Sequence, residues 1–594
     1  MPYSNKKVLT RFLKWRYRNI SNRTFIQIMS LIVGFLAGLV AVTVKNSTYF
    51  IESLLKKGIV FSENQLYFIL PTIGLTLVYL YVKFIHKEPL QHAVSSIIFS
   101  LSKKRGLLKL KDIYTPLITA PLTVGFAGSV GLLGPAVKSG SAVSSNLSRF
   151  FHIDAKTRTL LVACASAGAI ASIFQSPIAA IIFAVEVFTL DLTMMSMLPL
   201  LLASISGVLT SYFFLGNEVL FSFSLSEGFK LEDTAFYVLL GVGTGFASIY
   251  FTKMYFAILS LFKKLKSPKY KLLVGGVAIG IMLYAIPPLY GEGFGFINNL
   301  LDGDHLKALG TTPFDAFTDN IWVVIALLFG ITIFKAIAMT TTIGAGGAGG
   351  VFIPTMVMGS ALGNVVAKVI NNLGLGLSVS ESNFTLIGMA GLIAGVIHAP
   401  LTAIFLIAEI TGGYQLFVPL MITAAISYLI TKNALDYTIY TKELAKIGAL
   451  LSHNKDQMVL GLMEMDDVVE KNFKPVHPKM SLGEMLHQSV SKSKRNLFPV
   501  LDDEKKLIGI IVLDDIRPMM FDTELYDTVF VKNLMHAPPE IIFYETDNMK
   551  QVMKKFQDSG AWNLPVIKDG KYEGFISKSK MLTAYRRKLI NYSQ

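Results

Sequence analysis

The sequence is poor in cysteine and in charged residues. It has one cysteine among 594 residues, Cys164, so no disulfide can form within the chain, and the redox compartment stays open. Only 16% of the residues are charged, whereas ordinary soluble domains carry about 25%. Hydrophobic residues make up 52% of the chain, so we expect much of it to face lipid rather than water.

The sequence also lacks the spacings that mark common catalytic and metal sites. It contains no CxxC or HExxH pair, no Walker A loop and no recognisable Ser/His/Asp set. Isolated histidines such as His398 stand inside apolar segments, where packing is the simpler explanation. We therefore expect no enzyme, no metal site and no required cofactor.

Acidic residues are fewer than basic ones, which gives a formal net charge of +15. The basic residues gather at Lys6–Arg23, Lys103–Lys111 and Lys263–Lys271, beside apolar stretches. This pattern is typical of cytoplasmic flanks next to anionic lipid rather than of a nucleic-acid surface. The first apolar run, Phe25–Val44, is too long for a cleavable signal. We expect residues 1–23 to form a cytoplasmic basic segment of a multi-pass protein, in a plasma (inner) membrane, that binds no nucleic acid.

The composition of the chain changes near residue 440. Before this point, apolar runs recur, several of them long enough to cross a bilayer at about 20 residues per crossing. After it, charged residues mix with short β-rich strings such as Lys506–Val512 and Asn563–Ile567. We predict an all-α polytopic membrane domain followed by an α/β cytosolic pair of repeats. The predicted boundaries are 24–450 for the membrane domain, 451–470 for a linker, and 471–522 and 529–590 for the two repeats.

The membrane part contains an internal repeat. Pro177 precedes Glu186 by the same spacing that separates Pro400 from Glu409. Upstream, the segments 134–140 and 353–359 each place a glycine five residues after a proline. Matching segments broken by glycine and proline are typical of transporters built from an inverted repeat of broken helices, with the substrate site where these helices meet near the membrane midplane.

The two glycine-rich turns, 128–134 and 344–350, each lead through a proline into a helix. A helix N-terminus exposes backbone N–H groups and the positive end of the helix dipole, so it can bind an anion without a fixed countercharge. The alternative is that these glycines only allow close helix packing. Their occurrence in register in both halves favours the anion site.

These segments resemble signatures of the CLC chloride channel and transporter family. The string Gly349–Pro354 resembles the family's GxFxP element, Gly131–Pro135 its GxEGP segment, and Thr438–Thr441 the end of its last membrane helix, with the anion-coordinating tyrosine at Tyr440. The resemblance implies a homodimer with one pore per subunit, in which chloride or a similar small anion is held by two helix N-termini, a central hydroxyl and the tyrosine. The anion-binding positions carried over are His92, Gly131, Leu132, Leu133, Gly134, Gly350, Val351, Phe352, Ile353 and Tyr440.

The departures from the family pattern bear on mechanism. Leu133 stands where the resemblance places a gating glutamate, and Val187 stands where antiporters have a second, proton-admitting glutamate. A leucine can neither ionise nor imitate an anion. We therefore predict a passive chloride-type channel that is not coupled to protons. Two alternatives stay open: a coupled antiporter that uses Glu186, His92 or a water wire, and a nucleotide-sensing membrane scaffold with a vestigial pore.

The turn that would supply the central hydroxyl also departs from the pattern. His92 replaces the serine of the family's GSGIP turn, and it either donates a hydrogen bond to the anion or only ends a helix at the membrane face. Ser95 and Ser96 are alternative hydroxyl donors. Lys138, one turn inside the helix after Pro135, either attracts anions or extends into an aqueous vestibule, and we favour the vestibule.

The C-terminal segments Phe473–Phe521 and Val529–Leu589 resemble two CBS repeats. In that family, paired repeats often bind adenine nucleotides through a hydroxyl and an acid. Here the first repeat has the acid, Asp515, without the hydroxyl, and the second has the hydroxyl, Ser577, without the acid. An adenine nucleotide could bind at this pair, but we favour a dimerising and stabilising module.

Overall fold

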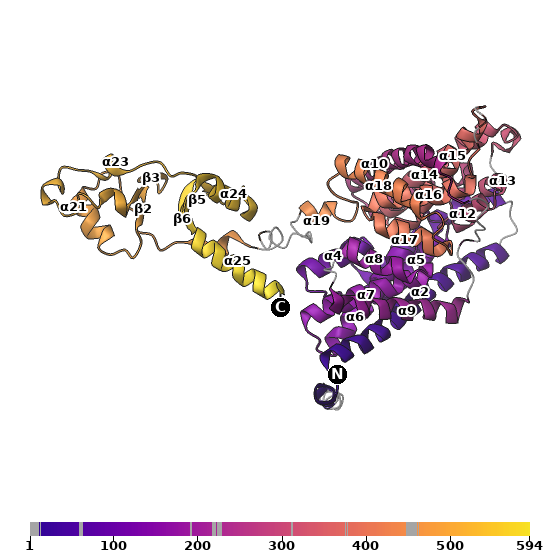
Figure 1. The fold of residues 1–594 in the computed structure, drawn as a ribbon, viewed down its shortest axis with the longest axis horizontal. Coiled ribbons are helices and arrows are strands. Elements are labelled where there is room, and N and C mark those ends of the chain that lie inside the picture. The colour runs from indigo at the N-terminus through magenta and orange to yellow at the C-terminus, as the bar shows by residue number, and fades with distance from the viewer. Residues whose placement is uncertain are drawn as a thin grey trace. The chain divides into compact units, whose positions relative to one another are not determined.

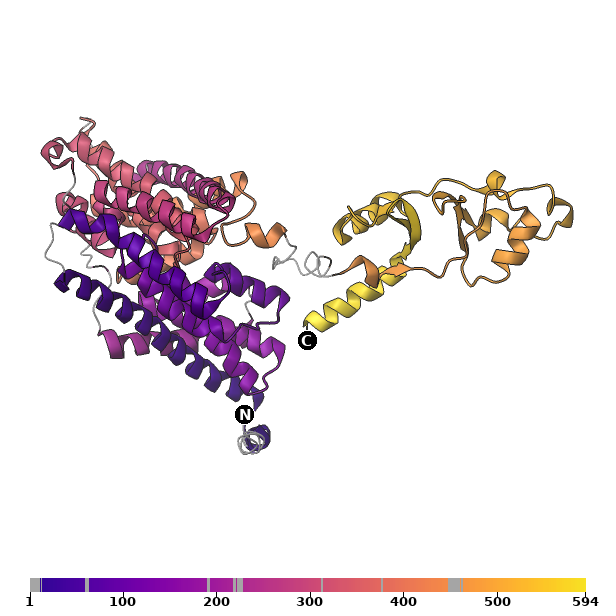
Figure 2. The same cartoon turned by 180° about the vertical axis from the view of Figure 1, so that it is seen from behind.

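The computed structural model describes residues 11, 13–58, 63–189, 193–216, 221, 228–310, 313–374, 376, 378–446, 460 and 463–593. The chain divides into two units, Met1–Leu451 and Ser452–Gln594 (Figures 1 and 2). The first ten residues of the predicted basic segment, and most of the predicted linker 451–470, lie outside the described residues.

The first unit is helical, and eight α-helices with defined bounds lie in the described part of its N-terminal half. These are α2 (Asn22–Gly58), α3 (Glu63–Tyr81), α4 (Ala93–Lys103), α5 (Lys111–Gly125), α6 (Leu133–Phe150), α7 (Ala155–Phe174), α8 (Pro177–Phe188) and α9 (Met194–Leu215). Most of these helices coincide with apolar runs of the sequence, whereas α6 is rich in serine and glycine.

The second half repeats this order. Its helices are α10 (Thr234–Lys264), α11 (Pro268–Ala285), α12 (Phe294–Leu301), α13 (His305–Leu309), α14 (Ile321–Gly344), α15 (Phe352–Asn372), α16 (Glu381–Ile397), α17 (Pro400–Ile410), α18 (Phe417–Ala434) and the short α19 (Lys442–Lys446). The packing repeats as well, because α6 packs on α7 as α15 packs on α16, and α2 packs on α9 as α10 packs on α18.

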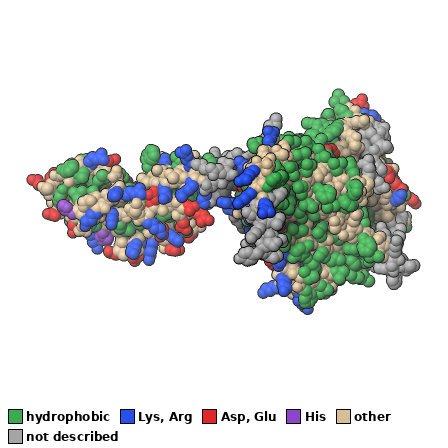
Figure 3. All heavy atoms as spheres, turned by 90° about the horizontal axis from the view of Figure 1, so that it is seen from below, with side chains coloured by type: hydrophobic (Ala, Val, Ile, Leu, Met, Phe, Trp, Pro, Cys, Tyr) green, Lys and Arg blue, Asp and Glu red, His purple; other side chains and the backbone are tan. Residues whose placement is uncertain are grey.

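Within the described residues, eight helices are long and apolar enough to cross a membrane. Large apolar side chains cover the outside of this unit and form the broad hydrophobic surface seen in Figure 3. Phe213 is 83% exposed and Phe246 is 64% exposed, which would be unfavourable in water but suits contact with lipid or with another apolar surface. The prediction of a multi-pass membrane domain is confirmed.

Two long apolar runs of the sequence are each broken into two helices. The run 158–190 turns at Gln175, which has a left-handed φ of 57°, and α8 then starts at Pro177. The run 384–411 turns at His398, with φ 58°, and α17 starts at Pro400. Proline is favourable in a first helical turn, where its missing N–H is not needed, so the two halves break at equivalent places.

The described part of the second unit contains two small sheets. The four-stranded sheet has the order β1-β6-β5-β4, and the other pairs β2 with β3. The strands are β1 (Val469–Glu470), β2 (Leu497–Leu501), β3 (Leu507–Val512), β4 (Ile542–Phe543), β5 (Asn563–Lys568) and β6 (Lys571–Ser577). The helices are α21 (Leu482–Met485), α22 (Leu513–Ile516), α23 (Val531–Leu534), α24 (Met549–Ser559) and α25 (Lys578–Ser593).

The two repeats share an apolar contact around Phe473 and Phe575, whose ring centroids are 4.7 Å apart. Ile510 of β3 belongs to the same buried cluster, so the two sheets are joined through side chains. The predicted α/β character of the C-terminal region is confirmed.

Candidate functional site

The two glycine-rich turns meet in the middle of the first unit. Gly131 and Gly350 exchange backbone hydrogen bonds, with N–O distances of 2.9 and 2.6 Å, as a short antiparallel bridge. A Cβ atom on Gly350 would lie 2.9 Å from the backbone nitrogen of Gly134. Glycine at position 350 is therefore required for the two turns to approach this closely.

A pair of threonines connects the turns in a reciprocal way. Thr123, in the last turn of α5, accepts a hydrogen bond at its Oγ1 from the N–H of Ala348, 3.0 Å away. Thr342, at the equivalent place in α14, accepts one from the N–H of Ser129 at 3.4 Å. Each half thus holds the turn of the other, which fixes the starts of α6 and α15 next to each other.

This arrangement brings two helix N-termini together. α6 starts at Leu133 and α15 starts at Phe352, each two residues after the bridge. The first N–H groups of a helix have no partner within the helix, and the dipole makes this end positive. Six predicted anion-binding positions, Leu132, Leu133, Gly134, Val351, Phe352 and Ile353, lie at these two ends, and the other two glycines form the bridge.

A third helix start lies beside them. A Cβ atom on Gly134 would be 3.4 Å from the Cβ atom of Ala93, the first residue of α4. His92 is the N-cap residue of α4, and its Nδ1 is 3.3 Å from the hydroxyl oxygen of Tyr255 on α10. Sequence reasoning missed Tyr255, because no motif separates it from the other aromatic residues of a membrane helix.

Tyr440 is buried, with 8% of its surface exposed. It stands in a turn between α18 and α19, not at the end of the last long helix, as the resemblance had suggested. Of the alternative hydroxyl donors, Ser96 turns its Oγ back to the carbonyl oxygen of Ala93 at 2.7 Å. The structure thus places the imidazole of His92 at the start of α4, with the phenol of Tyr255 beside it.

Apolar side chains surround the paired helix starts. Leu133 and Phe352 are each 2% exposed. The ring of Phe352 packs against Phe174 and Phe183, at centroid distances of 5.5 and 6.2 Å. Backbone donors inside an apolar enclosure suit a small, weakly held anion, because the low dielectric strengthens each N–H interaction without adding a charge that would trap the ion.

Glu186 and Glu409 cap each other's helices. The carboxylate of Glu186, near the end of α8, accepts hydrogen bonds from the N–H groups of Leu401 and Thr402 at 3.1 and 2.8 Å. Glu409, near the end of α17, accepts from Ile178 and Ala179 at 3.0 and 2.8 Å. The end of each helix meets the start of the other, so α8 and α17 run antiparallel, as an inverted repeat requires.

We expect Glu186→Ala to lower thermal stability without changing how the reversal potential depends on pH. The substitution removes charge-assisted hydrogen bonds at the start of α17, which contribute about 1.5–3 kcal/mol each. Thermal unfolding in detergent and reversal potentials in a bilayer measure the two effects. Glu409→Ala is the matched control, and both variants should behave alike. A proton effect confined to Glu186→Ala would instead identify a proton-relay residue.

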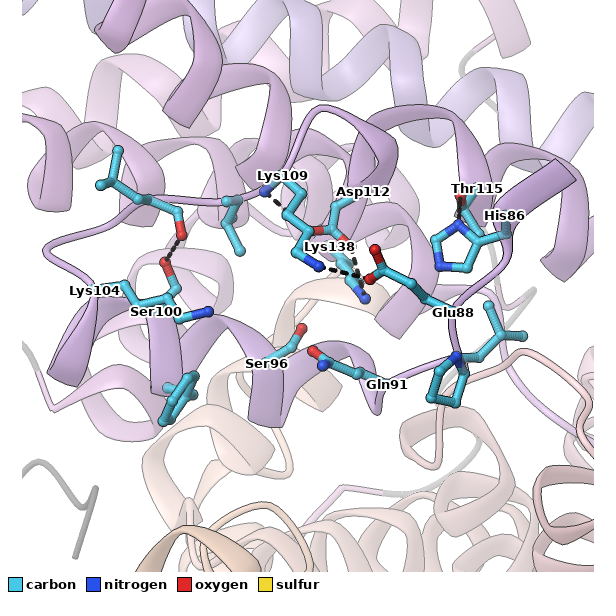
Figure 4. A pocket seen from close by; sticks show the side chains of 15 residues that line it. His86, Glu88, Gln91, Ser96, Ser100, Lys104, Lys109, Asp112, Thr115 and Lys138 are labelled. Atoms are coloured by element: carbon cyan, nitrogen blue, oxygen red, sulfur yellow. Dashed lines mark hydrogen bonds and ion pairs between the residues drawn. The ribbon is translucent and has the colours of Figure 1, made fainter. Parts of the chain in front are cut away.

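Lys138 lines a polar cavity of about 100 Å³ (Figure 4). Its ammonium lies 3.1 Å from a carboxylate oxygen of Asp112, and only 10% of the Lys138 side chain is exposed. Other lining residues include Glu88, Lys109 and Ser96. The cavity is polar, as a vestibule would be, but the charge of Lys138 is paired, so it adds less positive potential than a free lysine would.

Sequence reasoning missed a carboxylate at the start of α6. Glu292 lies between η3 (Pro287–Leu289) and α12, and its Oε1 accepts a hydrogen bond from the N–H of Leu132 at 2.7 Å. The only sequence signal is its place between Gly291 and Gly293, in a turn that follows an apolar helix. Neither feature points to α6, which lies 160 residues away in sequence.

The turn that carries Glu292 is fixed by a buried lysine. Lys335 of α14 is 0% exposed, and its Nζ donates to the carbonyl oxygens of Leu289 and Gly291, both at 3.0 Å. The hydroxyl of Ser129 donates to the same Leu289 oxygen at 2.6 Å. The turn is therefore tied both to α14 and to the glycine-rich turn that precedes α6.

The two nucleotide candidates of the second unit take part in local contacts. Ser577 donates to a carboxylate oxygen of Glu470 at 2.6 Å and accepts from the N–H of Lys580 at 3.1 Å. Asp515 accepts from the N–H of Val512 at 3.1 Å, as a capping residue of α22. Within the described residues, no group of three or more His, Cys, Asp or Glu side chains could hold a metal ion.

The sequence matches two known families. Residues 73–432 match the family described as voltage gated chloride channel, and residues 465–521 and 531–587 each match the CBS domain. The putative chloride channel protein ClcB-like of Ralstonia nicotianae is 25% identical over 346 residues, covering 57% of this chain and 76% of that protein. The H(+)/Cl(-) exchange transporter ClcA of Vibrio campbellii is 26% identical over 341 residues, covering 54% and 69%.

A solved structure of a eukaryotic CLC transporter superimposes on 93% of this chain and 97% of its own length, with a TM-score of 0.57. At 17% identity, this likeness concerns the fold alone. The sequence relatives include one protein named a channel and one named an exchanger.

Proposed function

Because the chain belongs to the voltage gated chloride channel family and ends in two CBS domains, we propose that it is a passive conductor of chloride-type anions. The observation that carries this proposal is the meeting of the α6 and α15 N-termini across the Gly131–Gly350 bridge. Two positive helix ends in an apolar enclosure bind an anion through backbone donors. The chain carries out no covalent reaction in this role, and it requires no cofactor.

The passive mechanism is supported by the residues at the two proton-relay positions of the family. Leu133 and Val187 cannot carry a proton. Glu186, the alternative inner relay, has both carboxylate oxygens engaged by the start of α17. These hydrogen bonds give Glu186 a structural role at the start of α17, as Glu409 has at the start of α8.

The proposal extends to assembly and location. The chain forms a homodimer with one pore per subunit in an inner (plasma) membrane, and the basic N-terminal segment and the CBS domains face the cytoplasm. The CBS pair stabilises the assembly without a bound nucleotide, because Ser577 already pairs with Glu470 and Asp515 already caps α22.

The reversal potential of the purified protein in a planar bilayer tests the mechanism. Under a fixed chloride gradient, we expect reversal at the chloride equilibrium potential, and an added pH gradient should not move it. A displacement by the proton gradient would mean that anions and protons are coupled. An absence of chloride current and of chloride efflux from liposomes, at every pH, would overturn the proposal as a whole.

A further inference from the structure

The carboxylate of Glu292 lies where an anion would have to bind. Leu132 is the N-cap residue of α6, and its N–H is one of the donors at the positive end of that helix. This donor is taken by Glu292, at 2.7 Å. A small anion that reaches the start of α6 must compete with the carboxylate for the same donor and for the same helix dipole.

We infer that Glu292 is a gate of this pore: its ionised carboxylate occupies the N-terminus of α6, and its protonation frees that end for the transported anion. The inference rests on the proposed anion site. The gating carboxylate comes from the turn before α12, not from the motif at the start of α6, where Leu133 stands. The helix end therefore has a carboxylate, that of Glu292, although position 133 is a leucine.

The surroundings of Glu292 set the balance between its two protonation states. The facing groups are Lys45, Tyr49 and Glu52 of α2 and Lys335 of α14. Glu292 belongs to a turn outside the membrane-spanning helices, and there desolvation raises the pKa of its carboxyl group to about 7. The N–H of Leu132 and the charges of Lys45 and Lys335 act in the opposite direction.

The same turn has the construction that a gate requires. The side chain of Glu292 is partly buried rather than fully enclosed. The backbone on its N-terminal side is fixed by the two hydrogen bonds of Lys335. Only the side chain has to rotate to leave the donor of Leu132, and side-chain rotation is fast compared with movements of the backbone.

The first test measures chloride efflux from liposomes that contain the full-length protein, with the same pH on both sides and valinomycin to clamp the potential. We expect the wild-type flux to rise as the pH falls through about 7. One pH unit above its pKa, about a tenth of a carboxyl group is protonated, so Glu292→Gln should carry roughly tenfold more flux than wild type at pH 8. Its flux should also be nearly independent of pH.

Glu52→Gln is the matched control. It removes a neighbouring carboxylate that acts on Glu292 through its charge. Because a like charge raises the pKa of a carboxyl group, this variant should keep the pH dependence, with its midpoint moved to lower pH. Size-exclusion elution and thermal unfolding confirm that both variants fold.

A second measurement needs no substitution. If chloride and the carboxylate exclude each other, chloride binding and protonation are linked. The midpoint of the pH curve should then rise with chloride concentration, by up to about one pH unit for a tenfold increase. A flux that depends on pH equally in wild type and Glu292→Gln, or a midpoint that ignores chloride, would overturn the gate. A chloride flux that is independent of pH would overturn the gate while leaving the anion conductor in place.

Discussion

Leu133→Glu should reduce chloride flux by about tenfold or more at pH 8, and acidification should restore it. The substitution puts a carboxylate in the first turn of α6, where Leu133 is now 2% exposed. A negative side chain at a partly buried helix N-terminus is stabilised by up to about 2 kcal/mol. Since 1.4 kcal/mol corresponds to a factor of ten, this carboxylate should compete strongly with the anion.

The measurement is efflux from liposomes across pH 5–8, in both the wild-type and the Glu292→Gln backgrounds. In the second background, the introduced glutamate is the only carboxyl group expected at this helix end, so its effect stands alone. Leu133→Gln is the control, because it has a similar size and polarity but no charge. If Leu133→Glu leaves the pH dependence unchanged in both backgrounds, the assignment of this segment to the anion path is wrong.

Lys335→Met should destabilise the membrane domain more than other lysine substitutions. Lys335 is 0% exposed, and its ammonium supplies the hydrogen bonds to Leu289 and Gly291. Methionine has a similar length but no donor, so Gly291 loses the hydrogen bond from Lys335, whereas the carbonyl oxygen of Leu289 keeps the one from Ser129. A buried carbonyl oxygen left without a partner costs about 1–3 kcal/mol. We expect the midpoint of thermal unfolding in detergent to fall by several degrees.

Lys432→Met is the matched control. Lys432 also donates to a backbone carbonyl oxygen, that of Asp436 at 3.1 Å, but its side chain is exposed. Substitutions at such exposed positions usually change stability by no more than about 0.5 kcal/mol. Equal unfolding midpoints for Lys335→Met and Lys432→Met would show that the turn around Glu292 does not depend on the buried lysine.

The sequence by itself determined the architecture and indicated where the candidate site lies. Glycine and proline act on the backbone of their own neighbourhood, so the turns before α6 and α15 and the breaks before Pro177 and Pro400 could be read directly. The equal spacing in the two halves indicated the repeat. The change from apolar runs to mixed charge located the C-terminal α/β region, because burial in lipid excludes charge over the whole length of a crossing.

Tertiary structure alone decided which side chains reach that site. Glu292 and Leu132 are 160 residues apart, and Glu186 and Leu401 are 215 apart, so neither pair leaves a local signature. The contact between Tyr255 and His92 left no local sequence signal for the same reason. Such contacts depend on how whole helices pack. A buried polar group needs a hydrogen-bond partner, and the fold rather than the local sequence decides which partner lies within reach. The start of α6 was thus readable from sequence, but the carboxylate that accepts a hydrogen bond from its Leu132 N–H was not.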